Sequence, residues 1–179
     1  MLTLLVGGAR SGKSTLAVQM AERQNTPVTF IATAEPFDDD LRERVARHRE
    51  ERPAHWHTVE CAIELAAAIE AVPAEHFLIV DCLTVWLGNL FAHVGKIPII
   101  AGYGLDTTAA LERRQSRGGA TVVVSNEVGM GIHPETEMGR EYRDELGRLN
   151  QSVAAIADTT LLLVAGRAIR LDDPWELLK

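Results

Sequence analysis

The sequence predicts an α/β fold in which a mostly parallel sheet is flanked by helices, and two observations lead to this prediction. Short apolar runs alternate with longer stretches of helical character, which is typical of strand–helix units joined into a parallel sheet. The glycine-rich segment GGARSGKS joins the first apolar run to the first helical stretch. With 179 residues, 46% of them hydrophobic, the chain suits one domain spanning residues 1–179.

The first elements follow in chain order. The apolar run at 2–6 predicts a buried strand, and residues 13–24 have the composition of a helix. A second apolar run predicts a strand over 28–33. The acidic first turn of 38–50 suits the positive end of a helix dipole, so this stretch predicts a second helix. A short strand is expected at 57–60.

The middle of the chain continues the alternation. The alanine-rich stretch 62–71 predicts a helix, the run at 76–81 predicts a buried strand, and the apolar stretch 83–94 predicts another helix. Residues 95–105 carry three glycines and a proline, so we expect a loop there. The helical pattern returns over 107–118.

The last third of the chain completes the pattern. A strand is predicted over 120–126, a long helix over about 136–157, and a last strand or hairpin over 159–171. No internal repeat or low-complexity tract interrupts the sequence, which again favours a single domain.

Composition and charge argue against several classes of function. The net charge of −7 disfavours a nucleic-acid or anionic-membrane surface, because a polyanion is not attracted to an acidic protein as a whole. No apolar stretch is long enough to cross a bilayer, and the N-terminal run has the pattern of a buried strand rather than a signal peptide. Cys61 and Cys82 match no metal or redox spacing. We therefore expect a cytoplasmic protein with reduced thiols.

The strongest motif is the phosphate loop G-x-x-x-x-G-K-[S/T] between a predicted strand and a predicted helix. Its backbone N–H groups and the start of the helix favour phosphate oxygens. Lys13 would neutralise the β- and γ-phosphates of ATP or GTP, and the Ser14 hydroxyl would bind Mg²⁺. The predicted nucleotide-binding residues of the loop are Gly7, Gly8, Ala9, Arg10, Ser11, Gly12, Lys13 and Ser14.

Asp81 ends the apolar run at 76–81, where the carboxyl end of a parallel strand is expected. A phosphate loop needs an acid on a nearby strand to hold the shell of Mg²⁺, and Asp81 is the candidate. Its other interpretation is the N-cap of the helix over 83–94. Both roles are compatible with this position.

His48 lies in the run ERVARHREERPAHW, which carries four arginines. On this stretch alone, a solvated charged helix is the simpler interpretation. In a helix over 38–50, however, Leu41, Val45 and His48 share the stripe that faces the protein. Neighbouring arginines bind phosphate and disfavour protonation of the imidazole, so its lone pair is available for attack on phosphorus.

The segment SNEVGMGIHPE follows the predicted strand at 120–126, so Asn126 and Glu127 are expected at the same edge of the sheet as Asp81. Glu127 has two interpretations of equal weight. It could orient magnesium, a water or an acceptor hydroxyl, or it could cap the turns of its own loop.

Four of these segments together closely resemble one family. GGARSGKS, the stretch from FIATAEP to HTVE, LIVDCLTVWLGNL and VVVSNEVGMGI follow in the order of the bifunctional adenosylcobinamide kinase/adenosylcobinamide-phosphate guanylyltransferases of cobalamin biosynthesis. The likeness covers about residues 2–93 and 120–166. It implies a RecA-like P-loop NTPase fold and a homotrimer.

The resemblance also implies two reactions. One phosphorylates adenosylcobinamide with ATP or GTP. The other attaches GMP to a histidine, which matches His48, and passes GMP to adenosylcobinamide phosphate. The implied guanine-nucleotide contacts outside the phosphate loop are Ala32, Thr33, Ala34, Arg49, Glu50, Glu51, Arg52 and Glu60.

The chain departs from the family between about 94 and 118, where a glycine-rich, basic segment replaces a longer acidic helical one. This departure concerns substrate contacts and subunit packing more than the nucleotide chemistry. Two other functions stay open from the sequence. One is a small-molecule kinase with a single activity, in which His48 only binds phosphate. The other is a RecA-like regulatory ATPase that acts on a protein partner.

Overall fold

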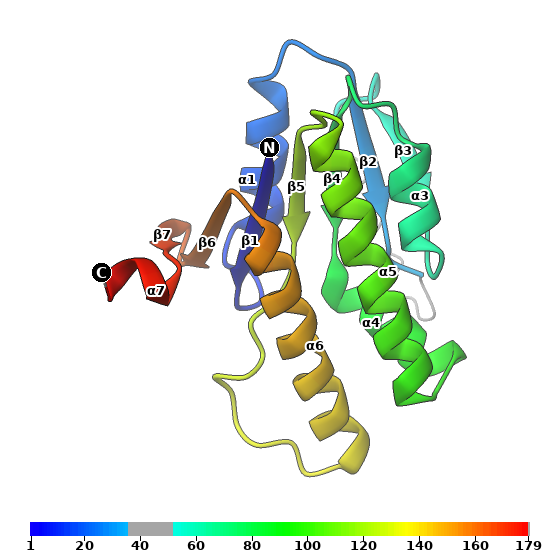
Figure 1. Cartoon of the computed structure of the whole chain (residues 1–179), viewed down its shortest axis with the longest axis vertical. Helices are drawn as coiled ribbons and strands as arrows, with labels where there is room; N and C mark the ends of the chain where they lie inside the picture. Colours follow the sequence, from blue (N-terminus) through cyan, green and yellow to red (C-terminus); the bar gives the residue numbers. More distant parts are fainter. Residues whose placement is uncertain (36–51, 179) are drawn as a thin grey trace.

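The computed structural model describes residues 1–35 and 52–178, and a single mixed sheet forms its centre (Figure 1). The sheet has seven strands in the order β3-β2-β4-β5-β1-β6-β7. All neighbouring strands run parallel except β6 and β7. The strands are β1 (Leu2–Gly7), β2 (Val28–Ala32), β3 (His57–Glu60), β4 (Phe77–Asp81), β5 (Thr121–Val124), β6 (Thr159–Val164) and β7 (Arg167–Leu171).

Helices cover both faces of the sheet. The longest helices, α5 and α6, lie in front of the strands in the view of Figure 1, and α1 lies behind them. The helices are α1 (Lys13–Glu22), α3 (Leu65–Ala71), α4 (Leu83–His93), α5 (Ile97–Ser116), α6 (Glu137–Ile156) and the short α7 (Pro174–Leu177). This arrangement, with the phosphate loop between β1 and α1, confirms the predicted RecA-like P-loop fold.

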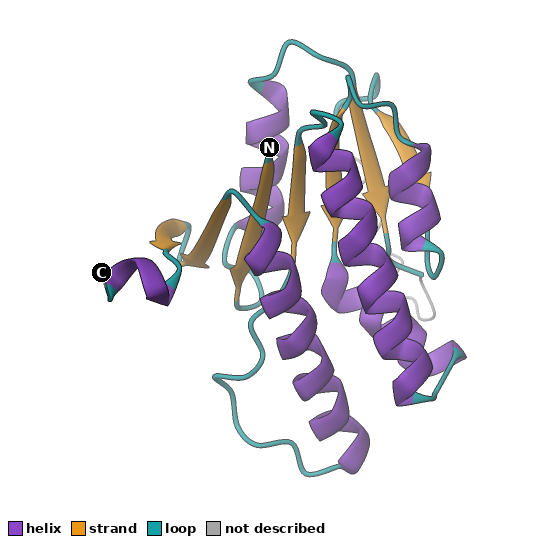
Figure 2. Cartoon of the chain, in the orientation of Figure 1, coloured by secondary structure: helices purple, strands orange, loops and turns teal. Residues whose placement is uncertain are grey.

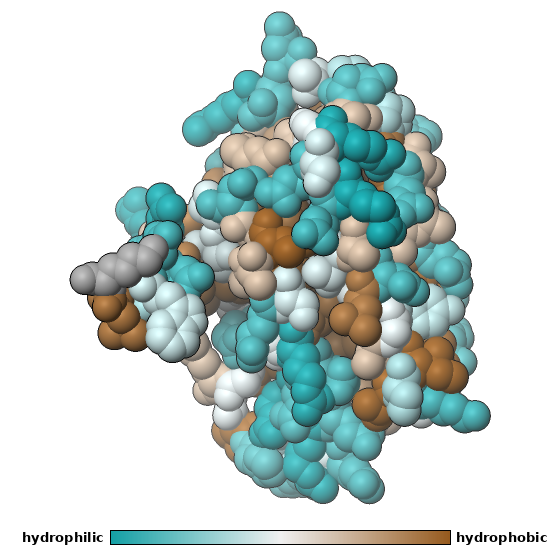
Figure 3. Space-filling model, in the orientation of Figure 1, coloured by the Kyte–Doolittle hydropathy of each residue, from teal (hydrophilic) through white to brown (hydrophobic). Residues whose placement is uncertain are grey.

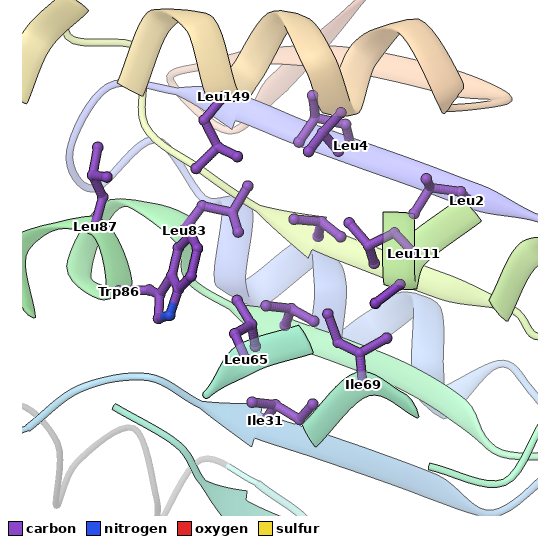
Figure 4. Close-up of a cluster of buried hydrophobic side chains, with 14 of the residues drawn as sticks. Leu2, Leu4, Ile31, Leu65, Ile69, Leu83, Trp86, Leu87, Leu111 and Leu149 are labelled. Atoms are coloured by element: carbon purple, nitrogen blue, oxygen red, sulfur yellow. The ribbon is translucent and has the colours of Figure 1, made fainter. Parts of the chain in front are cut away.

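The two faces of the sheet bury two separate apolar cores. The larger core lies under α3, α4, α5 and α6, and Figure 4 shows its buried side chains, with Leu65, Leu83 and Leu87 near Trp86. Trp86 is completely buried, and its Nε1 donates to the Ile63 carbonyl at 2.7 Å. The smaller core lies under α1 and includes Phe30 and Phe77. The central strands β1, β2, β4 and β5 are therefore buried on both faces, as parallel sheets require.

The predicted loop over 95–105 is wrong for most of its length, because α5 begins at Ile97. Pro98 sits in the first turn, where its missing N–H leaves no helix bond unmade. Gly104 lies against α6, with Leu149 Cδ1 3.6 Å from where its Cβ would be. Packing against α3 and α6 outweighs the low helix propensity of the glycines.

The predicted strand or hairpin over 159–171 is a hairpin, formed by the antiparallel strands β6 and β7. Ala165 and Gly166 both have positive φ, 51° and 71°, which is the geometry that tight antiparallel turns favour. The hairpin and α7 project from one edge of the sheet, away from the helical layers (Figure 2). The other predicted helices and strands are present with small shifts of their ends, and the predicted helix over 38–50 lies outside the described residues.

Candidate functional site

The phosphate loop has the backbone that its glycines predict. Gly7 and Gly12 have φ values of 151° and 98°, and Gly12 caps the N-terminus of α1 in the left-handed conformation. A Cβ on Gly7 would lie 2.3 Å from the carbonyl oxygen of Leu163, so no larger residue fits there. The chain can therefore turn sharply from β1 into α1 and point its N–H groups inward.

Lys13 is folded into this loop. Its Nζ donates to the carbonyls of Gly7 at 3.0 Å and Gly8 at 2.7 Å, and to Ser11 Oγ at 3.3 Å. Burial lowers the pKa of Lys13, and the neighbouring Cys82 and Asp81 oppose that shift. An ammonium group that gives up water for carbonyl partners gains strongly from an anion, so the loop is built for phosphate.

A cavity of about 420 Å³ opens next to the loop. Its wall comes from residues that are far apart in the sequence and meet at the carboxyl edge of the sheet, where parallel α/β sheets bind ligands. The lining residues are Ala9–Thr15 of the loop together with Ala32, Ala34, Arg52, Asp81, Cys82, Val85, Val124 and Asn126.

The sheet register places the carboxylate of Asp81 at this cavity. Asp81 pairs with Val124 on one side and with Ala32 on the other, and Ala32 pairs with Glu60. Asp81 and Ser14 both line a second, adjoining hollow as well. A carboxylate and a hydroxyl are hard oxygen donors, so this pair fits Mg²⁺ bound beside phosphates. The alternative role of Asp81 as helix cap is wrong, because Cys82 caps α4.

Cys82 is a half-buried side chain at the start of α4. Its Sγ accepts from the Val85 N–H at 3.5 Å, and burial raises the pKa of its thiol to about 12. Its backbone is bonded in both directions to Thr33: the Cys82 N–H donates to Thr33 Oγ1, which donates to the Cys82 carbonyl, each at 2.8 Å. Thr33 thus joins the end of β2 to the end of β4 with its hydroxyl.

Asn89 of α4 reinforces this junction. Its Nδ2 donates to the Thr33 carbonyl at 2.8 Å and to the Ala62 carbonyl at 3.1 Å. The flanking residues Ala32 and Ala34 line the cavity as predicted. Thr33 itself is completely buried and does not line the cavity, but its hydrogen bonds hold the ends of β2 and β4 together.

Arg52 follows the undescribed segment and reaches the cavity. Its guanidinium carbon lies 3.6 Å from the centre of the Phe30 ring, a cation–π contact with β2. The predicted site residues His48, Arg49, Glu50 and Glu51 lie outside the described residues. Glu60 is exposed at the end of the edge strand β3, in one row with Ala32 and Asp81, and does not line the cavity.

Asn126 and Glu127 lie at the end of β5, between the phosphate loop and Asp81. Asn126 lines the cavity. Glu127 donates its N–H to the Gly7 carbonyl at 3.1 Å, and its Oε1 accepts from the N–H groups of Gly129 at 2.5 Å and Met130 at 3.2 Å. Glu127 therefore has the geometry of the loop-capping interpretation.

Several residues that shape the site carry no motif. Thr15 and Val85 also line the cavity. Thr15 directly follows Ser14, and Val85 comes one helical turn after Asp81, so their spacing from these two residues could have indicated them. Asn89 and the α6 residue Asn150 act on strand ends through long-range hydrogen bonds. A single sequence contains no local signal for such contacts.

The chain matches a known protein family over nearly its whole length. A sequence model of the cobinamide kinase / cobinamide phosphate guanyltransferase family matches residues 3–171. The chain belongs to this family. Family membership extends through α5, the segment that departs most from the pattern expected for the family.

Named relatives match over nearly their whole length. The chain is 40% identical over 167 residues to the bifunctional adenosylcobalamin biosynthesis protein CobP of Pseudomonas aeruginosa, covering 93% of this chain and 94% of that one. It is 36% identical over 186 residues to the bifunctional adenosylcobalamin biosynthesis protein CobU of Salmonella typhimurium, covering 96% and 99%.

Among solved structures, a KaiC-like protein from Pyrococcus horikoshii aligns with 90% of this chain and 69% of its own, at 15% identity and a TM-score of 0.47. Within residues 1–35 and 52–178, no helix is long and apolar enough to cross a membrane.

Proposed function

We propose that this protein is a bifunctional enzyme of cobalamin biosynthesis, an adenosylcobinamide kinase and adenosylcobinamide-phosphate guanylyltransferase. The observation that carries the proposal is a phosphate-loop cavity with Lys13, Ser14 and Asp81 on its wall, in a chain that matches the family over residues 3–171. A family of this description needs one site that grips a nucleoside triphosphate. The phosphate loop and the cavity beside it support such a site.

In the kinase reaction, the hydroxyl oxygen of adenosylcobinamide attacks the γ-phosphorus of ATP or GTP. The bond from the γ-phosphorus to the bridging oxygen breaks, the nucleoside diphosphate leaves, and the hydroxyl proton passes to solvent. Lys13 and the backbone N–H groups of the loop hold the β- and γ-phosphates. Ser14 and Asp81 would hold Mg²⁺, which supplies positive charge against the charge that develops on the phosphates.

In the guanylyltransferase reaction, a ring nitrogen of His48 attacks the α-phosphorus of GTP and pyrophosphate leaves. A phosphate oxygen of adenosylcobinamide phosphate then attacks the same phosphorus, the imidazole leaves, and adenosylcobinamide-GDP forms. Ala34 and Arg52 support this role for His48. Both line the cavity, and His48 belongs to the stretch of sequence that connects them.

The decisive experiment is incubation of the protein with GTP labelled in the α-phosphate and Mg²⁺. We expect a covalent GMP adduct that is labile to acid and stable to base, as a phosphoramidate is. His48→Ala should abolish the adduct and spare phosphorylation of adenosylcobinamide by ATP, whereas the control variant His55→Ala should keep both activities.

An adduct that survives His48→Ala would contradict the assignment of the nucleophile. Phosphorylation without any adduct in the wild type would reduce the function to a kinase alone. Nucleotide hydrolysis that is indifferent to adenosylcobinamide would favour the regulatory ATPase instead.

The proposed enzyme works in the cytoplasm as a homotrimer. The projecting C-terminal hairpin and α7 support association, because their apolar side chains are exposed in the single chain and gather at one end of it (Figure 3). These residues are Val164, Ile169, Leu171, Trp175, Leu177 and Leu178.

A further inference from the structure

The side chain of Asn150 joins α6 to the end of β5. Its Oδ1 accepts from the Ser125 hydroxyl at 2.6 Å, and its Nδ2 donates to the Asn126 carbonyl at 3.0 Å. Reversing the amide would place two carbonyl oxygens against each other, so only one orientation satisfies both contacts. Both ends of this amide therefore act on consecutive residues of one strand end.

The backbone of Asn126 is held entirely by side chains in this network. Its N–H donates to Thr84 Oγ1 of α4 at 2.7 Å, and its carbonyl accepts from Asn150. The residues on either side are held differently. Ser125 donates its N–H to the Leu5 carbonyl at 2.9 Å, and Glu127 donates to the Gly7 carbonyl at 3.1 Å. Asn126 is thus the position whose orientation depends on helix side chains.

Asn126 lies at the cavity beside the phosphate loop. It lines the cavity with Lys13 and Asp81, and it follows β5, the strand that lies between β1 and β4. Its carboxamide offers two N–H donors and an acceptor. A donor fixed in place before the reaction stabilises the charge that develops on a transferring phosphoryl group far better than a donor that must first be ordered.

We propose that Asn150 is a positioning residue for phosphoryl transfer, which acts by holding Asn126 toward the phosphate cavity. The inference rests on the proposed kinase function and adds to it a residue outside the cavity wall. Tyr142 supports the same arrangement from α6, because its hydroxyl donates to the Thr84 carbonyl at 2.9 Å. A merely structural amide would stabilise the fold without affecting the reaction through Asn126.

A double-mutant cycle on the full-length protein tests this route. Asn150→Ala should lower kcat for adenosylcobinamide phosphorylation roughly tenfold or more, with KM for ATP changed less than about threefold. Added to Asn126→Ala, the same change should lower kcat by less than about twofold, because the residue through which it acts is already gone. Ser152→Ala, on the same helix, is the matched control and should leave kcat unchanged.

A second variant separates an effect on the reaction from an effect on folding. Asn150→Asp retains the shape and the acceptor for Ser125 but has no donor for the Asn126 carbonyl, so it should lower kcat as Asn150→Ala does. Ser125→Ala leaves that donor in place and should have the smaller effect. Melting temperatures report folding for every variant.

Three outcomes would overturn the inference. Losses in kcat that multiply in the double variant would show that Asn150 does not act through Asn126, as would an unchanged kcat in Asn150→Asp. A wild-type protein that binds ATP but does not phosphorylate adenosylcobinamide would refute the kinase function itself, and the inference with it.

Discussion

Lys13 is the residue on which both proposed reactions depend. Its three hydrogen bonds within the loop and its burial mean that a bound phosphate would meet an ammonium already directed into the site. We predict that Lys13→Ala lowers kcat/KM for ATP and for GTP roughly 100-fold to 1,000-fold, as loss of a transition-state donor does.

Steady-state kinetics of both reactions check this prediction, and Lys96→Ala is the control because Lys96 is an exposed lysine at the start of α5. A Lys13→Ala variant that loses only one of the two activities would contradict a shared triphosphate site.

Asp158 gives the protein a defined dependence of stability on pH. Its Oδ2 accepts from the Leu2 N–H at 2.6 Å and from Gln115 Nε2 at 2.9 Å, and the hydrogen bond from Leu2 is the main cause that lowers the pKa of its carboxyl below 3.8. A lowered pKa stabilises the folded state fully above the ordinary carboxyl pKa. The stabilisation is lost as the pH falls through that value toward the lower folded pKa.

Asp158→Asn should therefore lower the melting temperature at pH 7, and the difference from wild type should shrink at about pH 3. Calorimetry at both pH values measures the change, with Asp106→Asn on the exposed side of α5 as the control. A difference that stays constant with pH would contradict the role given to the carboxylate.

At the scale of elements, α5 is fixed to the amino ends of the strands by one buried cation. Arg114 is completely buried, and burial lowers the pKa of its guanidinium. Its side chain donates to Thr121 Oγ1 at 3.0 Å and to the carbonyls of Val72, Pro73 and His76 at 2.9, 3.0 and 2.6 Å. This side chain holds together α5, β5 and the turn before β4.

Arg114→Met should lower the free energy of unfolding by roughly 3 kcal/mol, because several buried carbonyls lose their donor at once. The neighbouring Arg113→Met removes an exposed ion pair with Glu70 and should cost less than about 1 kcal/mol. Denaturant unfolding of the two variants compares them directly, and equal losses would refute the prediction.

The elements themselves were largely predictable because apolar periodicity reports burial on a parallel sheet. The helix α5 was not, since Gly102, Gly104 and Pro98 have low helix propensity and the packing of α5 against α3 and α6 involves distant residues. The short helix α7 was likewise missed. Its N-cap Asp173 and the following Pro174 are start signals, but the helix itself is only four residues long.

The same limit applies to the site. A motif predicted the phosphate loop, and strand order predicted Asp81 and Asn126 at one edge, because parallel strands bring their carboxyl ends together. The hydrogen bonds made by the Thr33 hydroxyl and by the side-chain amides of Asn89 and Asn150 join parts of the chain that are distant in sequence. They depend on which helix packs over which strand end. That information exists only in the assembled fold.

For the whole molecule, the C-terminal end predicts association. Trp175 is 73% exposed and Leu178 is 75% exposed, although both are strongly apolar. We predict that the combined variant Trp175→Glu/Leu178→Glu shifts the protein from the proposed trimer to the monomer, because charge cannot be buried unpaired at an interface.

Light scattering after size-exclusion chromatography measures the mass of each species. Leu105→Glu on α5 is the control, since Leu105 is also exposed but lies away from the C-terminal end. A combined variant that remains trimeric, or a wild type that is monomeric at micromolar concentration, would contradict the assignment of this surface.

The register of the sheet also works as a ruler. Leu5, Val124 and Asp81 form one row, so the strand that leads into the phosphate loop stands two strand spacings, roughly 10 Å, from the strand that ends in the acid. Backbone hydrogen bonding between the strands sets this distance, so most side-chain substitutions leave it unchanged. A substitution at Asn126, two residues after Val124, can therefore change reactivity while the separation between the phosphate loop and Asp81 stays constant.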